Sequence, residues 1–321
     1  MMPPNVLSSS ALPPLAIAVF DTHDYDRAAW LATVLPAHYH VRYINERLSP
    51  ETCHYAHDCR VVCGFVNDDL SAKTFTRLAA QGVQLLTLRC AGYNHVDLVA
   101  ARAAGIRVMR VPAYSPPAIA EQAFALLLAL QRRLPEALTR TRQGDFHLDG
   151  LVGHTLAGKT FGVIGTGNIG TAALHIAAGF GCQLLAHDLA PNPKLRELGC
   201  HYVSLEALLR RSDVISLHLP LTPDTENLIN TQRLAWLRPQ AILLNTARGG
   251  IVDTVALLDA LDNNQLAGAG LDVYAHEAGV FFPPSGGANV TPDPLLQRLL
   301  QHPRVLLTAH QAFLTTTMVL A

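Results

Sequence analysis

Short, nearly continuous apolar runs recur along the first third of the chain, and longer amphipathic stretches separate them. Such runs are typical of parallel strands in a sheet that helices cover on both faces. Two of the intervening stretches, residues 71–80 and 95–104, have apolar residues at helical spacing, and Gly105 lies where a helix C-terminal stop is expected. The pattern predicts a β/α array. Its strands are expected at residues 15–20, 39–44, 61–65, 84–88 and 107–111.

A second array follows a proline-rich crossing. Pro112, Pro116 and Pro117 interrupt the chain, so a domain boundary is expected near Ala113, and residues 119–134 form an apolar segment long enough to be a buried helix. These strands are again almost wholly apolar, so we predict an α/β fold with two doubly wound parallel sheets. The strands of the second array are expected at residues 161–165, 183–188, 214–219, 241–246, 268–273 and 305–309.

A glycine fingerprint connects the first strand of the second array to a helical stretch. Its GxGxxG glycines are Gly165, Gly167 and Gly170. The first permits a tight turn, the second lets the backbone approach a pyrophosphate, and the third lets helix and strand pack closely, with the helix N-terminus facing the phosphates. Because the motif lies between a strand and a helix, it predicts a dinucleotide site.

Asp188 supplies the acidic residue expected about 20 positions after the glycine turn. A carboxylate there accepts hydrogen bonds from the ribose hydroxyls and repels a 2′-phosphate, and the next three residues, Leu-Ala-Pro, include no arginine to receive one. NAD is therefore predicted in preference to NADP. The alternative is an aspartate that only caps the end of a strand.

Composition narrows the class of protein. With 321 residues the chain is expected to form about two domains, and 50% hydrophobic against 15% charged residues exclude a disordered chain. The 24 Lys and Arg residues balance 25 Asp and Glu residues without a basic block, so we expect no nucleic-acid partner.

The apolar segments are too short to cross a membrane. Residues 123–130, the longest uninterrupted apolar run of the first half, fall well short of the roughly 18 residues that a spanning helix needs. No Lys or Arg precedes Arg27, so the charged region of a secretory signal is absent. We expect a cytoplasmic protein with reduced cysteines and no membrane partner.

An early group of cysteines and histidines suggests a metal site, but its spacing fits zinc patterns only loosely. Cys63 lies inside the apolar run of residues 61–65, so its sulfur is expected to be buried in a strand. We therefore predict no metal. The group consists of Cys53, His54, His57, Cys59 and Cys63.

Three polar residues follow strands of the second array, at the edge where open α/β sheets bind ligands. Arg248 offers a planar guanidinium suited to a carboxylate, His310 is an acid or base for neutral pH, and Glu277 would stabilise an imidazolium. Taken singly, each would more often be a satisfied polar residue. Together with a hydride source, they supply what the reduction of a 2-oxo acid needs. The other histidines, including His218 and His276, are interpreted as structural.

Six segments, spread over nearly the whole chain, carry a resemblance to a known family. In chain order they are residues 89–94 (RCAGYN), 111–116 (VPAYSP), 165–170 (GTGNIG), 213–218 (DVISLH), 245–249 (NTARG) and 308–313 (TAHQAF). Together they resemble the NAD-dependent D-2-hydroxyacid dehydrogenases, and among them most of all the fermentative D-lactate dehydrogenases. The resemblance implies that His310 is the proton donor, that Glu277 is its charge partner, and that Arg248 binds the substrate carboxylate and polarises the carbonyl.

The same resemblance implies further contacts. Backbone amides at Ala91 and Gly92 would bind the substrate carboxylate, Tyr114 would line the substrate pocket, and Asp272 would contact the nicotinamide carboxamide. The NAD groove would be lined by Asn168, Ile169, Leu219, Pro220, Asn227, Thr246 and Ala247, besides the three glycines, Asp188 and Arg248.

The family also implies a discontinuous topology and a homodimer. Residues 1–112 and 311–321 would form a flavodoxin-like substrate domain and residues 113–310 a Rossmann NAD-binding domain, with the active site in the interdomain cleft and hinge closure on substrate. Residues 119–134 and the segment up to Leu156 would form the dimer interface. The alternative for residues 119–134 is an ordinary buried helix.

Two segments depart from the family pattern. The chain ends at Ala321, eleven residues after His310, where the family continues into a helix packed against the first domain. Apolar surface on that domain is therefore expected to be exposed. Residues 281–284 place two prolines where an acidic pair is expected.

We therefore expect hydride transfer from NADH to pyruvate to give D-lactate, with the oxidation as the reverse reaction. Alternatives within the class are a bulkier 2-oxo acid, glyoxylate or hydroxypyruvate, because side chains around Tyr114 and Phe313 set the size of the pocket. Outside it, a non-catalytic NAD-binding or corepressor-like protein and a truncated, inactive relative stay open.

Overall fold

The computed structural model describes residues 13–24, 26–27, 35–90, 92–93, 95–111, 115–277, 279–281 and 293–316. These residues divide into two compact units: unit 1 holds the described residues up to 111, and unit 2 holds those from 115 onward. Residues 311–316 thus group with unit 2. The predicted domains, 1–112 with 311–321 and 113–310, stay a prediction. Residues 282–284 and 317–321, on which the two predicted departures depend, lie outside the described residues.

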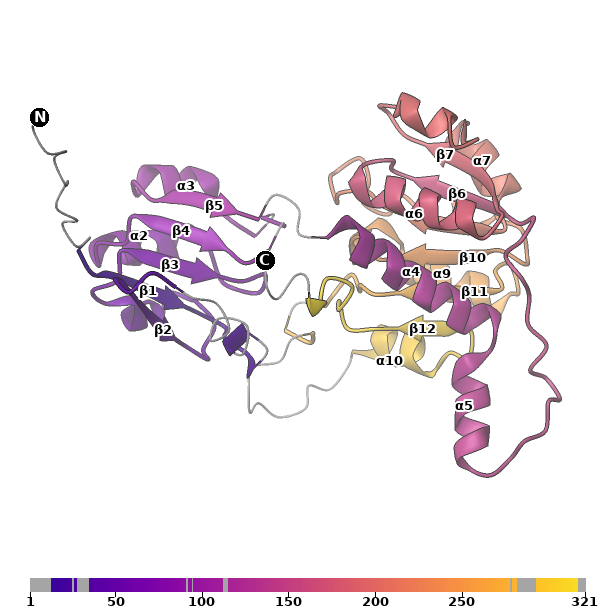
Figure 1. Cartoon of the computed structure of the whole chain (residues 1–321), viewed down its shortest axis with the longest axis horizontal. Helices are drawn as coiled ribbons and strands as arrows, with labels where there is room; N and C mark the ends of the chain where they lie inside the picture. Colours follow the sequence, from indigo (N-terminus) through magenta and orange to yellow (C-terminus); the bar gives the residue numbers. More distant parts are fainter. Residues whose placement is uncertain are drawn as a thin grey trace, which may run out of the picture. The chain divides into compact units, whose positions relative to one another are not determined.

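The described residues of unit 1 form a five-stranded parallel sheet in the order β2-β1-β3-β4-β5 (Figure 1). This is the strand order of the flavodoxin-like folds. Each predicted strand is present within one residue of its expected bounds, and the core contains buried Phe20, Phe75 and Leu86. The elements are β1 (Leu15–Val19), β2 (Tyr39–Tyr43), η1 (Cys53–Ala56), β3 (Val61–Gly64), α2 (Ala72–Ala80), β4 (Leu85–Leu88), α3 (Leu98–Ala103) and β5 (Arg107–Arg110).

The described residues of unit 2 form a seven-stranded parallel sheet in the order β12-β11-β10-β9-β6-β7-β8. Counted from β6, this is the Rossmann order 3-2-1-4-5-6 with one strand added. Strand β8 was not predicted, because two residues are too few to give a periodic signal. The strands are β6 (Thr160–Ile164), β7 (Gln183–His187), β8 (His201–Tyr202), β9 (Val214–Leu217), β10 (Ile242–Asn245), β11 (Gly268–Leu271) and β12 (Val305–Leu307).

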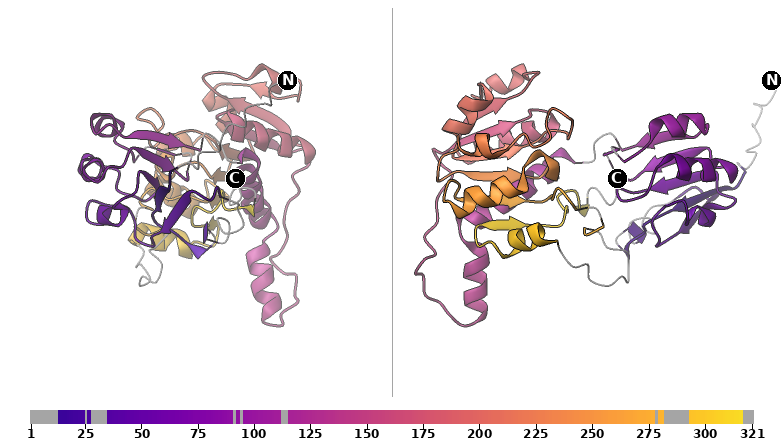
Figure 2. Two further views of the ribbon diagram at one scale, coloured as in Figure 1. Left: turned by 60° about the vertical axis from the view of Figure 1, so that its left-hand side comes forward. Right: turned by 180° about the vertical axis from the view of Figure 1, so that it is seen from behind.

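Helices cover both faces of the unit 2 sheet, which confirms the doubly wound prediction. α4 (Pro116–Gln131) and α6 (Asn168–Gly179) lie side by side on one face, and α9 (Thr254–Asp262) lies on the other (Figures 1 and 2). Phe124 of α4 stacks on Phe161 of β6 with ring centroids 5.1 Å apart. The other helices are α5 (Leu134–Arg142), α7 (Leu205–Arg211), α8 (Thr231–Leu234) and α10 (Pro294–Gln301), with the 3-10 helices η2 (Pro193–Arg196) and η3 (Gly249–Ile251).

The helix expected over residues 119–134 begins and ends earlier than predicted. Ser115 caps α4 by accepting a hydrogen bond from the amide of Ala118. Prolines are tolerated in the first turn because the amides there have no partner within the helix. Arg133 has a φ of 48°, a left-handed conformation that separates α4 from α5.

The early cysteines are part of the core of unit 1. Cys63 lies in β3 and is buried, as predicted. Within the described ranges, no three His, Cys, Asp or Glu side chains are grouped as a metal site would need. None of the described helices is long and apolar enough to cross a membrane.

Candidate active site

The turn between β6 and α6 leaves open space at one glycine and none at the other two. Gly165 has a φ of 92°, and a Cβ atom there would clash with the carbonyl oxygen of His218. A Cβ atom at Gly170 would clash with the carbonyl oxygen of Gly165. Gly167 caps α6, and nothing lies within 4 Å of the place its Cβ would take. Open space at a helix N-terminus suits a phosphate, so this turn fits the pyrophosphate of a dinucleotide.

Asp188 follows the end of β7, and the glycine turn holds its carboxylate. Oδ2 accepts hydrogen bonds from the amide and the hydroxyl of Thr166 at 2.5 and 2.9 Å, and Oδ1 accepts one from the amide of Ala190 at 2.8 Å. Burial acts to raise the pKa of Asp188, but these hydrogen bonds outweigh it and hold the pKa below its ordinary value. Asp188 therefore does cap the strand end. A carboxylate offers about four acceptor positions, so a ribose hydroxyl can still bind.

The remaining residues predicted for the NAD groove follow strands of unit 2. Thr246 comes directly after β10, and its buried hydroxyl has no hydrogen-bond partner among the described residues. A buried hydroxyl without a partner is suited to a ligand atom. Asn168 and Ile169 open α6, Leu219 and Pro220 come after β9, Asn227 lies farther along the same loop, and Ala247 follows Thr246.

His310 and Glu277 form a close pair in unit 2. Nδ1 of His310 lies 2.7 Å from Oε1 of Glu277, and Oε2 of Glu277 accepts a hydrogen bond from the amide of Tyr274 at 3.0 Å. The two side chains are 17% and 24% exposed, so a substrate can reach them in a partly desolvated setting. A carboxylate on Nδ1 orients the ring and fixes its tautomer. Proton transfer to a substrate would then use Nε2.

Asp272 holds the loop that carries His310. Its fully buried carboxylate accepts hydrogen bonds from the amides of Gln311 and Ala312, at 3.0 and 2.8 Å, and from the hydroxyl of Thr308. Its main-chain carbonyl accepts the amide of His310 at 2.6 Å. His310 has a φ of 51°, which is uncommon for a residue other than glycine. Asp272 is thus a positioning residue in this structure, and its contact with the nicotinamide stays a prediction.

A further side chain, Gln122, supports this arrangement from α4. Its Nε2 donates a hydrogen bond to Oγ1 of Thr308 at 3.2 Å. The hydroxyl of Thr308 in turn donates a hydrogen bond to the Asp272 carboxylate. Burial raises the pKa of Asp272, and the hydrogen bond from Thr308 opposes that rise. No role was predicted for Gln122. The signal that the sequence offers is a polar residue in a mostly apolar helix, and Gln122 shares that signal with Glu121 and Gln131.

Arg248 lies on a loop next to the one that leads to Glu277. It follows β10 by three residues, and Nδ2 of Asn245 fixes its backbone by donating to its carbonyl oxygen at 2.9 Å. A Cβ atom at Gly249 would clash with the main chain of Tyr274, so the two loops lie directly against each other. The predicted catalytic residues therefore follow the adjacent strands β10, β11 and β12, at one edge of the sheet.

Of the residues predicted to bind the substrate in unit 1, the structure describes one. Ala91 and Tyr114 lie outside the described residues. Gly92 is described, and its carbonyl oxygen lies 3.2 Å from Sγ of Cys90. The roles of all three in substrate binding stay predictions.

Arg89, which lies just before Ala91 and Gly92, is a supporting residue that the sequence did not reveal. Its guanidinium pairs with Asp26 at 2.6 Å, donates to the carbonyl of Phe20 at 2.6 Å, and lies over the ring of Phe65. These contacts anchor the chain where it leaves β4. A lone arginine after a strand has no sequence pattern that would mark this role.

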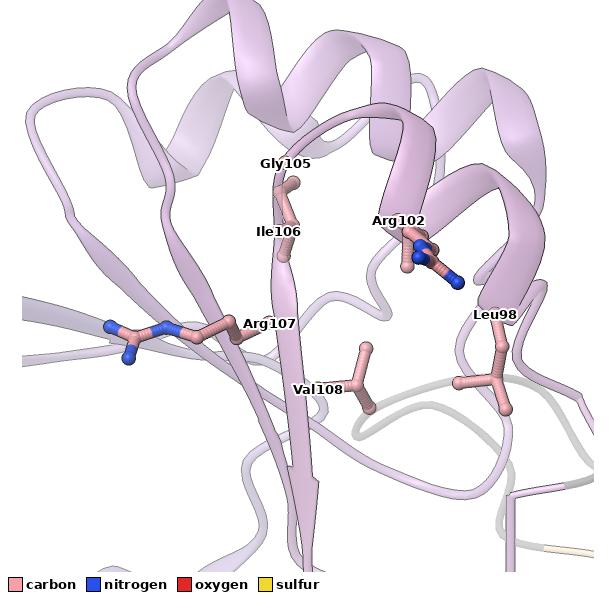
Figure 3. Close-up of a pocket in the computed structure, with 7 residues that line it drawn as sticks. Leu98, Arg102, Gly105, Ile106, Arg107 and Val108 are labelled. Carbon is pink, nitrogen blue, oxygen red and sulfur yellow. The ribbon is translucent and has the colours of Figure 1, made fainter.

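A separate cavity of about 380 Å³ lies in unit 1, between α3 and β5 (Figure 3). Its lining combines apolar side chains with two guanidinium groups and contains no histidine, carboxylate or thiol. None of the predicted site residues lines it. The cavity is therefore not the candidate active site. Its lining residues are Leu98, Ala101, Arg102, Gly105, Ile106, Arg107 and Val108.

Comparisons with known proteins identify the family of the chain. The family model described as "D-isomer specific 2-hydroxyacid dehydrogenase, NAD binding domain" matches residues 124–312. The chain is 43% identical to a 2-hydroxyacid dehydrogenase homolog of Haemophilus influenzae and 42% identical to the D-lactate dehydrogenase of Escherichia coli, each over 94% of this chain and 91% of the relative. The apo-structure of D-lactate dehydrogenase from Escherichia coli superposes with a TM-score of 0.87 at 40% identity, over 95% of this chain and 92% of that one.

The predicted resemblance is confirmed over nearly the full length of the chain, and the matching family model is an NAD-binding domain that contains the glycine turn, Arg248, Glu277 and His310. The protein belongs to the D-isomer specific 2-hydroxyacid dehydrogenases, which are NAD-dependent oxidoreductases.

Proposed function

We propose that the enzyme is a D-lactate dehydrogenase, which interconverts pyruvate and D-lactate. The observation that carries this proposal is the 2.7 Å contact between His310 and Glu277, since the loop that leads to Glu277 lies directly against that of Arg248. The reduction of a 2-oxo acid requires a proton donor with a charge partner and a guanidinium that binds the carboxylate. The similarity to relatives named D-lactate dehydrogenase supports pyruvate as the 2-oxo acid.

Each side chain has a distinct task in this reaction. Arg248 binds the substrate carboxylate with its planar fork and polarises the carbonyl group. His310 gives a proton from Nε2 to the carbonyl oxygen during reduction and takes it back during oxidation. Glu277 stabilises the imidazolium between these steps. Bound NADH supplies the hydride, and the turn at Gly167, the Asp188 carboxylate and the Thr246 hydroxyl are the groups that fit this cofactor.

A substrate panel tests the choice of 2-oxo acid. NADH oxidation is measured with pyruvate, glyoxylate, hydroxypyruvate and a branched 2-oxo acid, and the four are ranked by kcat/KM. We expect pyruvate to rank first and the product to be the D-isomer. A branched acid, glyoxylate or hydroxypyruvate at the head of the ranking would replace lactate as the assigned product while leaving the dehydrogenase class intact.

We also propose that the enzyme is a homodimer that associates through an arm formed by α5 and the loop after it. This segment projects from the sheet of unit 2 (Figures 1 and 2) and carries five exposed large apolar side chains, the most exposed of which is Val152 at 81%. Apolar surface of this extent fits an interface between copies of the chain. The others are Leu134, Leu138, Phe146 and Leu148.

Light scattering coupled to gel filtration tests the dimer. We expect the mass of two chains for the wild type and of one chain for Leu148→Glu. Val99→Glu, an equally polar change at an exposed residue of α3, is expected to leave the dimer intact. A wild-type mass of one chain would overturn the proposal.

A cytoplasmic location is proposed on the state of the cysteines. All six are free thiols in this structure, and five of them are buried. Reduced, buried thiols fit a reducing compartment. Titration of the unfolded protein without reductant should find six thiols, and a disulfide would contradict the assignment.

A further inference from the structure

A chain of hydrogen bonds from three separate segments ends on the Asp188 carboxylate. The amide of Asn192 donates to the hydroxyl of Tyr202 at 2.8 Å, and that hydroxyl donates to Oγ1 of Thr166 at 2.9 Å. Oγ1 of Thr166 in turn donates to Oδ2 of Asp188 at 2.9 Å. The chain thus joins the start of η2, strand β8 and the glycine turn to the end of β7.

The direction of each proton in this chain is fixed by the groups at its two ends. A backbone amide can only donate, so the Tyr202 hydroxyl accepts from Asn192 and has its one proton left to give. The carbonyl of Asn192 lies 3.5 Å from this hydroxyl, farther than Oγ1 of Thr166. Oγ1 of Thr166 accepts the hydrogen bond from Tyr202, so its own hydroxyl hydrogen is donated to Asp188, which as a carboxylate can only accept. Hydrogen bonds aligned in this way strengthen one another.

The chain also determines where the carboxylate points. Oδ2 receives both the amide and the hydroxyl of Thr166, while Oδ1 receives the amide of Ala190. With donors on both oxygens, rotation of the side chain away from the glycine turn would break three hydrogen bonds. The adjoining Leu189 is 98% exposed and contributes no charge that would offset the carboxylate.

We propose that Thr166 and Tyr202 are specificity-determining residues, which make the site select NAD against NADP by fixing the Asp188 carboxylate in place. Tyr202 is a positioning residue, because it acts through Thr166. A free 2′-hydroxyl can donate to a fixed carboxylate, whereas a 2′-phosphate carries about −1.5 to −2 charges and meets the carboxylate at close range. A carboxylate that could swing aside would lose part of this discrimination. The sequence indicated the acidic residue, and the structure assigns the two residues that hold it.

Direct binding measurements test the proposal without a 2-oxo acid, so the result does not depend on the proposed substrate. Dissociation constants for NADH and for NADPH are taken from the fluorescence change of the bound nicotinamide, for the wild type, Thr166→Val, Thr166→Ser and Tyr202→Phe. The readout is the ratio of the two constants. Melting temperatures of the same proteins report any loss of structure.

For Thr166→Val and Tyr202→Phe we expect the preference for NADH over NADPH to fall about tenfold, the factor that 1.4 kcal/mol represents. Thr166→Ser keeps the hydroxyl and is expected to stay within about twofold of the wild type. Two matched changes serve as controls and should leave the ratio unaltered: Tyr55→Phe, and Thr76→Val on the exposed side of α2.

Two outcomes would overturn the proposal. An unaltered ratio in Thr166→Val and Tyr202→Phe would mean that Asp188 discriminates without its hydrogen-bond chain. An equal loss of affinity for both cofactors, accompanied by a lower melting temperature, would mean that the chain only stabilises the fold.

Discussion

Nδ1 of His310 and Oε1 of Glu277 lie 2.7 Å apart, although 33 residues separate them in the sequence. They meet because Glu277 follows β11 and His310 follows β12, which are adjacent parallel strands. The Asp272 carboxylate then holds the main chain on the far side of His310 through the amides of Gln311 and Ala312. The pair is thus fixed by backbone contacts, so its side chains can be changed without removing the loop that carries them.

Loss of the charge on Glu277 should lower activity. Glu277→Gln keeps a hydrogen-bonding side chain, but the protonated imidazole of His310 loses its counter-charge. We expect kcat/KM for pyruvate reduction to fall about 10- to 100-fold. Glu121→Gln, at an exposed residue of α4, is the control. An unchanged kcat/KM in Glu277→Gln would contradict the role assigned to Glu277.

Replacement of Arg248 by lysine should weaken substrate binding specifically. Lysine retains the charge but cannot offer the planar fork that pairs with a carboxylate. Loss of a charge-assisted hydrogen bond costs about 1.5–3 kcal/mol, so the KM for pyruvate should rise by roughly one to two orders of magnitude. The dissociation constant for NADH, measured without pyruvate, is expected to change little. Arg107→Lys on β5 is the control, and a KM within about twofold of the wild type in Arg248→Lys would contradict the assignment.

Two glycines of the same turn should respond differently to alanine. Gly165→Ala forces a side chain into a left-handed conformation and against the carbonyl of His218, so we expect a loss of roughly 1–3 kcal/mol in the free energy of unfolding. Gly167→Ala meets no neighbouring atom, but alanine is a poorer N-cap than glycine, so we expect a smaller loss of about 0.5–1 kcal/mol. It should nevertheless weaken NADH binding, because its methyl group occupies the space assigned to the phosphates. Urea unfolding and NADH titration of both variants check these expectations. Normal NADH affinity in Gly167→Ala would contradict the assignment of the phosphate site to the space beside Gly167.

His218 should make the protein less stable in mild acid. Its Nε2 lies 2.9 Å from Oγ of Ser216, and burial lowers its pKa to about 4, below the ordinary value of 6.5. The unfolded chain therefore binds a proton more readily between pH 6.5 and 4, so this contribution to stability is complete above pH 6.5 and is lost as the pH falls toward 4. Its size is roughly 2–3 kcal/mol, since part of the ring still reaches solvent.

The variant His218→Asn isolates that contribution. The difference in free energy of unfolding between pH 7 and pH 4.5 should be smaller in His218→Asn than in the wild type. His40→Gln changes an exposed histidine and should reproduce the wild-type difference. Equal differences in all three proteins would show that His218 titrates normally.

The features that could be predicted from the sequence are those set by residues close together in the chain. Buried parallel strands are short apolar runs, so β1 and β6 could be placed within a residue, and the glycine turn is defined by neighbouring positions. Because such strands end at one edge of the sheet, Arg248, Glu277 and His310 could be assigned to one site. Strand β8 was missed because two residues carry no periodicity.

The supporting contacts could not be predicted, because each joins residues far apart in the chain. Thr308 and Asp272 are 36 residues apart, as are Tyr202 and Thr166, and no spacing rule connects them. Arg89 contacts the carbonyl of Phe20 across 69 residues. These partners are set by the strand order of each sheet and by side-chain rotamers. The sequence therefore predicted the groups that we propose to act on ligands, while the structure was needed to find the groups that hold them.

The most direct test of the account is pyruvate-dependent NADH oxidation by the wild type and His310→Gln, with His40→Gln as the matched control. General acid catalysis contributes about 10²- to 10⁴-fold, so kcat/KM should fall by that order in His310→Gln, while NADH binding and the melting temperature stay close to those of the wild type. Rates in His310→Gln comparable with the wild type would contradict the assignment of His310 as the proton donor.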